Sequence, residues 1–541
     1  MDSYALEETL QHLEMDNIIA RIWDRDPTVW GSPDGREVVD RLGWLTVVDT
    51  MTPRLAEIQA FAREIWDEGF THIVLLGMGG SSLAPHVLAK TLAPQDGYPR
   101  FHMLDSTVPA AVLQCARAID LAHTLFIVAS KSGSTIEMLS MFKYFWQQVS
   151  AITTSPGRAF VVITDPGSGL ERIAREHAFR AIFLNPTDIG GRYSALSLFG
   201  LVPAALAGVD IARLLQSAER MAARCSPAVP VRENPGALLG AFLGAMARQG
   251  RDKLALAISP RFADLGLWIE QLIAESTGKR GTGILPVVLP SGNRLADEAP
   301  RLADHALVAI THGGHGESGL PHPTAFTREL ADLYDLGGEF YCWEMATAVA
   351  GHILGVNPFD QPNVAEAKRN TANMLALYEQ RGALEPADAI TLGAHSDTGA
   401  PAEALRRFFA GIQPGHYCAV LAYLPPSDAW DALFAELQEQ LALRLGVAVT
   451  FGYGPRYLHS TGQLHKGGPA TGHFLILTAD DAEDVPIPGE RYTFGVLKNA
   501  QALGDRQALE AAGRPVLHLH LAGDAHQTAH ALRRAVQAAL G

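Results

Sequence analysis

The chain has 541 residues, 48% of them hydrophobic and 19% charged, and its formal net charge is −15. This length predicts roughly three to four globular units, and acidic charge without a basic block argues against nucleic acid as the main partner. Four scattered cysteines without CxxC spacing, an acidic N-terminus and no long apolar stretch indicate a cytoplasmic protein without disulfides, signal peptide or membrane span.

The first third of the chain predicts a helical segment followed by a parallel sheet. Residues 1–65 carry apolar side chains near a 3.6-residue period, which favours helices. HIVLLG (72–77) and TLFIVAS (124–130) are each expected to be a buried strand, followed by a Gly/Ser-rich loop and a helix. Further strands are predicted at 158–165 and 180–185. Strands that alternate with helices are typical of a parallel sheet.

The rest of the chain predicts two more units of the same kind. Strands are expected at 253–259, in GILPVVLP and in HALVAITH, a helix at 262–277, a loop at 311–323 and a buried helix at 340–355. A polar segment with Gly and Pro at about 380–403 predicts a linker. Beyond it, the segments HYCAVLAYLP, VAVTFGY, HFLILTA and PVLHLHL predict strands, with a helix at 427–445.

Two strands of the first unit end in loops with phosphate-binding chemistry. One loop is Gly77–Ser82 and the other is Ser130–Thr135, and each lies before a predicted helix. Glycines allow close backbone approach to an anion, and a helix N-terminus offers unpaired N–H groups and partial positive charge. Either loop alone could be only a tight turn with a helix cap. Because ligands bind at the carboxyl ends of parallel strands, the two loops together favour a phosphorylated small molecule.

Five segments carry a resemblance to a known family. SKSGSTIE resembles a sugar-isomerase phosphate loop, and IGGRYSALSLFG resembles the phosphoglucose isomerase signature around an active-site arginine. WIEQLIAESTGK, NPFDQPNVAEAK and RYLHSTGQLHKGG resemble the segments that bear the family's catalytic glutamate, its lysine and its histidine. The resemblance to the phosphoglucose isomerase family covers nearly the whole chain. It implies interconversion of glucose 6-phosphate and fructose 6-phosphate, in glycolysis and gluconeogenesis, without a metal or other cofactor.

The histidine segment stands in an unusual place. Most family members carry it between the glutamate and lysine segments, but here His459 follows Lys368 by about ninety residues. This order is similar to the isomerase part of transaldolase–phosphoglucose isomerase fusion proteins. No barrel-sized transaldolase region fits within the chain, so transaldolase activity is not predicted. The displacement leaves open whether His459 reaches the site, and a packed histidine is the alternative.

The resemblance implies a role for each matching residue. Glu275 would be the base that moves a proton between C2 and C1, and Arg192, after Gly190 and Gly191, would stabilise the enediolate. His459 and Lys368 would open the sugar ring. The paired glycines Gly190 and Gly191 suggest that the backbone there approaches a neighbouring segment closely. Substrate-binding residues would be Gly80, Ser81, Ser130, Lys131, Ser132, Thr135, Gln271 and Gln361.

The predicted fold is therefore α/β, with two sugar-isomerase-type parallel-sheet, doubly wound units and a C-terminal α/β unit. The expected ranges are 1–65 for the helical segment, 66–210 and 211–380 for the isomerase units, and 381–541 for the last unit. The cluster His312, His315, Glu317 and His322 fits no standard zinc spacing and is expected to be a polar loop. A homodimer is implied by the resemblance. Two alternatives stay open: a dual glucose/mannose 6-phosphate isomerase and a noncatalytic sugar-phosphate sensor.

Overall fold

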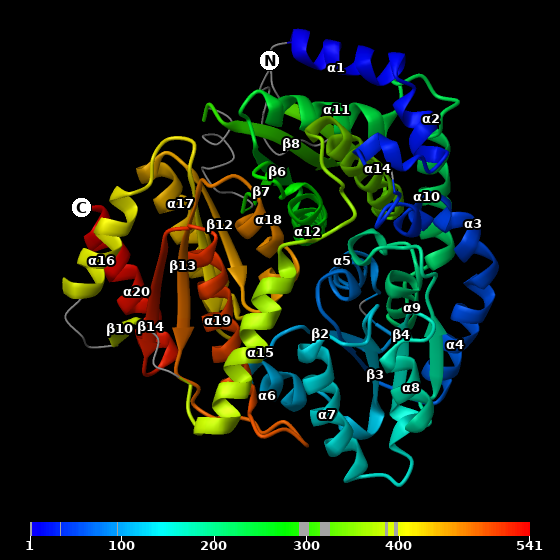
Figure 1. Ribbon diagram of the computed structural model, residues 1–541. Coiled ribbons are helices and arrows are strands. Elements are labelled where there is room, and N and C mark those ends of the chain that lie inside the picture. The colour runs from blue at the N-terminus through cyan, green and yellow to red at the C-terminus, as the bar shows by residue number, and fades with distance from the viewer. Residues whose placement is uncertain are drawn as a thin grey trace.

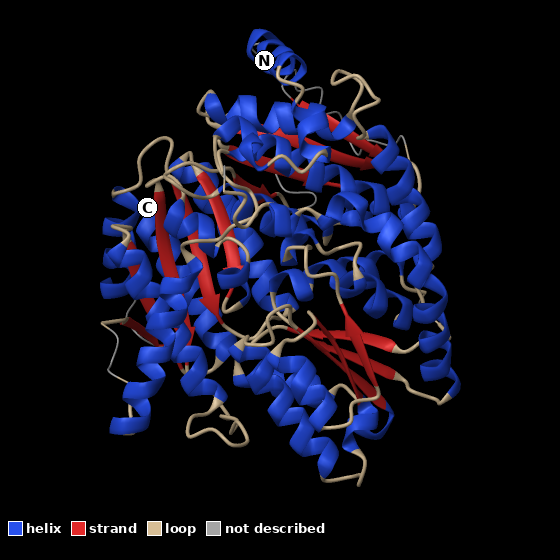
Figure 2. Ribbon diagram, turned by 45° about the vertical axis from the view of Figure 1, so that its right-hand side comes forward, coloured by secondary structure: helices blue, strands red, loops and turns tan. Residues whose placement is uncertain are grey.

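The computed structural model describes residues 3–32, 34–94, 96–290, 302–313, 325–384, 388–393 and 399–541. Within these residues the strands form three parallel sheets of five, four and five strands. Helices flank each sheet, as Figures 1 and 2 show. The predicted α/β class, with two parallel-sheet units and a C-terminal α/β unit, is confirmed, and the sheet of the C-terminal unit is parallel as well. Each sheet falls within one of the predicted ranges, while the boundaries of those ranges remain a prediction.

The predicted N-terminal helical segment is helical but broken. Short 3₁₀ turns separate its helices, beginning at Pro27, where proline fits a first helical position. The segment is anchored in the core, since Trp30 donates its indole N–H to the carbonyl of Ala348 at 2.8 Å. Its helices are α1 (Ser3–Met15), α2 (Ile18–Trp23), α3 (Val47–Met51) and α4 (Leu55–Asp67).

The first sheet has the strand order β2-β1-β3-β4-β5. β1 and β3 lie side by side, with His72 opposite Thr124. Strand β2 was missed in the sequence because it forms an edge, with polar Arg100 and His102 between apolar residues. The strands are β1 (His72–Leu76), β2 (Arg100–Leu104), β3 (Thr124–Ala129), β4 (Phe160–Thr164) and β5 (Ala181–Leu184); the helices between them are α5 (Leu83–Leu92), α6 (Pro109–Arg117), α7 (Ile136–Ser150) and α8 (Gly169–Glu176).

Three helices, α9 (Leu198–Leu206), α10 (Ile211–Arg224) and α11 (Pro235–Arg248), lead to the second sheet. Its order is β7-β6-β8-β9, formed by β6 (Lys253–Ile258), β7 (Leu285–Val288), β8 (His305–His312) and β9 (Ala325–Leu330). The first residues of the predicted loop belong to β8, and residues 314–323 lie outside the described part of the chain. Its helices are α12 (Leu265–Thr277), α14 (Leu336–Leu354) and α15 (Val364–Arg381). Helix α14 packs against α10 and α11 in a shared apolar core.

The third sheet corrects one prediction, because the expected linker contributes to it. Ile390–Gly393 forms strand β10 and pairs with β14, and α16 begins at Gly399. The short strand was hidden by the polar residues around it. The sheet order is β10-β14-β13-β11-β12. The remaining strands are β11 (Tyr417–Tyr423), β12 (Ala448–Tyr453), β13 (Gly472–Ala479) and β14 (Val516–Ala522); the helices are α16 (Gly399–Ala410), α17 (Asp428–Leu445), α18 (Gly462–Gly467), α19 (Phe494–Ala511) and α20 (Ala525–Leu540).

The three units pack around a common centre. Helix α15 lies against α19 of the last unit, and α12 contacts both α5 of the first unit and α18 of the last. Apolar side chains of α19, such as Phe494 and Leu497, join the core on one face of the first sheet. None of the helices in the described residues has the length and apolar character that a membrane span needs. Loops from all three units therefore meet at one place, where the first sheet's strands end.

Candidate active site

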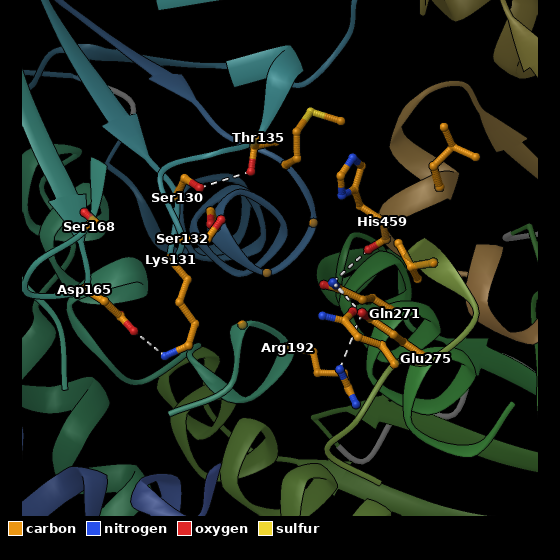
Figure 3. A pocket seen from close by; sticks show the side chains of 18 of the residues that line it. Ser130, Lys131, Ser132, Thr135, Asp165, Ser168, Arg192, Gln271, Glu275 and His459 are labelled. Atoms are coloured by element: carbon orange, nitrogen blue, oxygen red, sulfur yellow. Dashed lines mark hydrogen bonds and ion pairs between the residues drawn. The ribbon is translucent and has the colours of Figure 1, made fainter. Parts of the chain in front are cut away.

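A cavity of about 510 Å³ opens where the three units meet. Its wall is made by loops after β1, β3, β4 and β5, by α12, by the start of α15 and by the loop after β12. Figure 3 shows side chains from both sides of this cavity converging on it. Every residue predicted for the site lines it: Gly80, Ser81, Ser130, Lys131, Ser132, Thr135, Arg192, Gln271, Glu275, Gln361, Lys368 and His459.

The two Ser/Gly loops lie next to each other at the carboxyl edge of the first sheet, because β1 and β3 are neighbouring parallel strands. In the second loop, the Ser130 and Thr135 hydroxyls lie 3.0 Å apart, and Ser130 Oγ accepts the backbone N–H of Gly133 at 3.1 Å. Helix α7 begins directly after Thr135. The loop therefore presents hydroxyls and a helix N-terminus to one end of the cavity, as an anion site requires.

The close backbone approach predicted from Gly190 and Gly191 exists, but a different glycine requires it. A Cβ on Gly80 would lie 2.1 Å from the carbonyl oxygen of Gly191, whereas a Cβ on Gly191 would meet nothing within 4 Å. Gly79 has φ +53°, and a Cβ there would lie 2.7 Å from the carbonyl of His459. The first loop is thus glycine-rich because it packs between two other loops of the site.

Lys131 lines the cavity, but its ammonium is directed elsewhere. Nζ donates to Asp165 Oδ2 at 2.5 Å and to the carbonyl of Thr187 at 2.8 Å. Figure 3 shows the side chain extending toward Asp165. Burial raises the pKa of Asp165, and the bond and charge of Lys131 oppose that rise. Lys131 therefore contributes its charge to this end of the cavity mainly as a partner of Asp165, a residue that was not predicted from the sequence.

Glu275 and Arg192 form the opposite wall. Arg192 Nη1 lies 3.4 Å from Glu275 Oε1, and the two side chains are almost fully buried. Arg192 Nε donates to Ser276 Oγ at 2.8 Å, while Nη2 donates to the carbonyls of Pro358 and Asp360. Because these partners use all three nitrogens of the planar fork, the guanidinium is held rigidly.

Gln271 lies one turn before Glu275 on α12, so both side chains face the same side. Its Nε2 donates to Glu275 Oε2 at 3.1 Å and to the carbonyl of His459 at 2.8 Å. Its Oε1 is buried and has no hydrogen-bond partner within the described residues. A buried acceptor without a partner is costly, so this oxygen is a candidate to accept a hydrogen bond from a bound molecule.

His459 reaches the cavity despite its place in the chain. Its Nε2 lies 2.9 Å from Glu137 Oε1. Figure 3 shows the His459 side chain across from Thr135. The segment is tied to the first unit by Arg456, which binds Asp105 through two bonds of 2.6 and 2.8 Å. It is tied to the last unit by Tyr457, whose hydroxyl donates to Asp505 at 2.7 Å. These contacts hold the segment that carries His459 against both units.

Glu137 is a site residue that the sequence analysis missed, although it ends the quoted motif SKSGSTIE. Burial by itself would raise its pKa, but the charge and hydrogen bond of His459, with help from Lys368, bring the pKa below the usual range. An ionised carboxylate only accepts hydrogen bonds, so His459 donates from Nε2 and Nδ1 is left for other partners. Gln501 donates to the same oxygen at 2.8 Å.

Lys368 and Gln361 lie at the mouth of the cavity, and both side chains are exposed. Lys368 sits on α15 and makes no hydrogen bond or ion pair with any residue that the structure describes. Its ammonium is therefore available to a bound molecule, and its charge also acts on Glu137.

The lining is positive although the chain is acidic. Four arginines and lysines (Arg41, Lys131, Arg192 and Lys368) face two carboxylates, Asp165 and Glu275. An excess of one sign of charge along a cleft concentrates ligands of the opposite sign. Arg41, from the N-terminal segment, was not predicted.

No cluster of three metal-ligating side chains occurs among the described residues. Of the histidine-rich cluster in the sequence, only His312 is described, and its Nδ1 lies 3.0 Å from the carbonyl of Leu330. His315, Glu317 and His322 lie outside the described residues.

Comparison with known sequences gives a consistent result. The phosphoglucose isomerase family profile matches residues 33–315. The glucose-6-phosphate isomerase of Rubrobacter xylanophilus is 30% identical over 370 residues, which are 57% of this chain and 84% of that protein. The glucose-6-phosphate isomerase of Thermosynechococcus vestitus is 29% identical over 421 residues, 67% of this chain and 76% of the relative.

Solved structures show the same architecture. A hypothetical protein from Thermus thermophilus superimposes with a TM-score of 0.59 and 26% identity, over 69% of this chain and 97% of its own. A glucose-6-phosphate isomerase from Chlamydia trachomatis gives a TM-score of 0.51 at 22% identity, over 61% of this chain and 74% of its own. At this identity the second likeness shows the fold alone.

Proposed function

The chain belongs to the phosphoglucose isomerase family and has glucose-6-phosphate isomerase activity, and on this premise we propose how its cavity carries out the reaction. The observation that carries the proposal is the placing of Glu275 and Arg192 opposite two hydroxyl-rich loops across one cavity. One end would take the phosphate and the other would carry out the chemistry.

The phosphate would bind at the edge of the first sheet. Ser130, Ser132 and Thr135 would donate hydroxyl hydrogens to it, and Ser81 with the backbone of Gly80 would complete the site. The N-terminus of α7 and the positive lining favour a dianion there. Lys131, balanced by Asp165, would add its field rather than a direct bond.

Glu275 would be the base that takes the proton from C2 and returns it to C1. The proton is removable because Arg192 stabilises the charge that develops on the enediolate oxygens. The guanidinium already touches the Glu275 carboxylate at 3.4 Å, so both groups lie within reach of the same two carbons. Their burial excludes water, which strengthens the interaction.

Ring opening would fall to His459 and Lys368. With Nε2 bonded to Glu137, His459 can accept or donate a proton at Nδ1. Lys368 would donate to the oxygen that leaves C1 as the ring opens. One sugar hydroxyl would donate to Gln271 Oε1, which lacks a partner among the described residues. Another would form a hydrogen bond with Gln361 at the cavity mouth.

A coupled assay of fructose 6-phosphate to glucose 6-phosphate, with a chelator present and absent, tests this mechanism. Glu275→Gln is expected to lower kcat by about 10²–10⁴-fold, the range for loss of a general base. The chelator is expected to change nothing. Full activity of the variant would remove the assignment of the base, and no turnover by the native chain would favour a noncatalytic sensor. Mannose 6-phosphate in the same assay decides whether the enzyme is dual.

Three finer proposals follow from the sequence. The position of His459 in the last unit supports kinship with the isomerase part of the transaldolase fusion proteins. We also propose a cytoplasmic homodimer, which light scattering would detect as about twice 58.1 kDa. The proposed units are 1–65, 66–210, 211–380 and 381–541, and the three sheets that lie within the last three ranges support them.

A further inference from the structure

A buried lysine lies behind the site and does not line the cavity. Lys279 follows the end of α12, four residues after Glu275, and its side chain is 2% exposed. All three of its ammonium hydrogens are used. They go to the carbonyl of Asn357 at 2.7 Å, to the carbonyl of Asp360 at 2.6 Å and to Asp360 Oδ1 at 2.6 Å.

These bonds fix one turn, residues 357–360. Arg192 also holds this turn, since Nη2 donates to the carbonyls of Pro358 at 2.7 Å and Asp360 at 2.9 Å. The two cations share the Asp360 carbonyl oxygen. Gln361 follows this turn directly, and α15 with Lys368 begins three residues later. The turn therefore joins the wall that carries Glu275 and Arg192 to the residues at the cavity mouth.

Burying the charged ammonium of Lys279 here costs free energy. Burial, followed by the charge of Arg192, lowers the pKa of Lys279 to about 8, although Asp360 and Glu275 oppose the shift. An apolar side chain of similar volume is often as stabilising as a buried ion pair. Three donors in tetrahedral directions provide what an apolar chain lacks, namely a fixed distance to three oxygens of one turn. The buried lysine is therefore better explained by the precise placing of the 357–360 turn than by a gain in folding stability.

We propose that Lys279 is a positioning residue for the isomerase reaction, which fixes the 357–360 turn so that Arg192 keeps its place at the reacting carbons and Gln361 keeps its place at the cavity mouth. The proposal rests on the roles proposed above for Arg192 and Gln361. Without Lys279, Arg192 would be the one cation among the described residues still bonded to the carbonyls of the turn, beside the bond of Asn357 to the carbonyl of Glu37 and the packing of Phe359, and the guanidinium would follow any movement of those carbonyls. A misplacement of about 1 Å costs on the order of 10²-fold in rate.

The expected effect of Lys279→Met is a selective loss of transition-state stabilisation. We expect kcat to fall about 10- to 100-fold while KM for the sugar phosphate changes by less than about threefold, because the phosphate loops are untouched. A sugar-phosphate hydroxamate, which imitates the enediolate, should lose affinity by the same factor as kcat.

The matched control is Lys253→Met. Lys253 is equally buried on β6 and donates to Asp252 Oδ1 at 2.6 Å and to the carbonyl of Gly415 at 2.7 Å, but it does not line the cavity. Lys253→Met should lower the melting temperature about as much as Lys279→Met does, and it should keep kcat within twofold. Should Lys279→Met fail to fold, Asp360→Ala removes one of the three bonds at a partly exposed residue and should lower kcat several-fold.

The inference is overturned if Lys279→Met or Asp360→Ala keeps kcat within twofold, or if Lys253→Met loses kcat equally. It is also overturned if hydroxamate affinity and KM weaken together. Arg192→Lys separates this result from failure of the proposed mechanism. Full activity of Arg192→Lys would refute the proposed role of Arg192 itself. If Arg192→Lys loses activity while Lys279→Met keeps it, only the positioning role of Lys279 is refuted.

Discussion

Replacing Glu137 by Gln tests whether the buried carboxylate directs His459. The substitution keeps the shape and leaves a carbonyl oxygen near His459 Nε2, which now lies 2.9 Å from Glu137 Oε1. A hydrogen bond to a charged group contributes about 1.5–3 kcal/mol, and one between neutral groups about 0.5–1.5 kcal/mol. The bond thus weakens by about 1–1.5 kcal/mol, which corresponds to about tenfold in rate.

The assay compares ring-closed fructose 6-phosphate with an open-chain analogue that needs no ring opening. Glu137→Gln should lower kcat about tenfold for the first and by less than twofold for the second. Gln501→Met serves as control, because it removes the other bond to Glu137 and leaves the carboxylate in place. A variant with unchanged kcat, or with equal losses on both substrates, would refute the reasoning.

Three further predictions concern the ties around the site. Arg456→Met should lower the free energy of unfolding by about 3–5 kcal/mol in urea titrations, because it leaves buried Asp105 unpaired. Adding Asp105→Asn should recover part of the lost free energy, and a loss below about 1 kcal/mol in the single variant would contradict the prediction. Burial raises the pKa of Glu270 to about 7, so between pH 4.5 and 7 the native state holds a proton that the unfolded state has lost, and stability falls as pH rises. Glu270→Gln should therefore gain melting temperature relative to the native chain from pH 5 to pH 8, and a constant difference would argue against it. Lys131→Met should raise KM about tenfold, because it leaves the Asp165 carboxylate unpaired beside the phosphate. Adding Asp165→Asn to the same chain should restore KM, and a KM that stays high would mean that Lys131 binds the phosphate directly.

The strands and site loops of the first sheet were predictable because their signals are local. Buried parallel strands read as continuous apolar runs, and glycines and hydroxyls follow them directly. Strand β2 gave no such signal, since an edge strand such as Arg100–Leu104 alternates polar and apolar residues. Strand β10 gave none because four residues inside a polar segment are too few to show a pattern.

Contacts between distant segments could not be predicted. Nothing near His459 in the sequence indicates that Arg456 pairs with Asp105, about 350 residues away. The direction of the Lys131 ammonium depends on Asp165 at the end of another strand. The need for glycine at position 80 arises from the carbonyl of Gly191, which the chain brings near only after folding. Motifs thus predicted which residues gather, and tertiary packing decides which atoms meet.

Proton exchange at the reacting carbons tests the central claim most directly. Glucose 6-phosphate and the enzyme are incubated in D₂O, and deuterium at C2 of glucose 6-phosphate and C1 of fructose 6-phosphate is followed by NMR. If Glu275 moves the proton through an enediolate, the native chain should incorporate deuterium during turnover, and Glu275→Gln should lose isomerisation and exchange together. A Glu275→Gln chain that retains isomerisation and exchange would contradict the account.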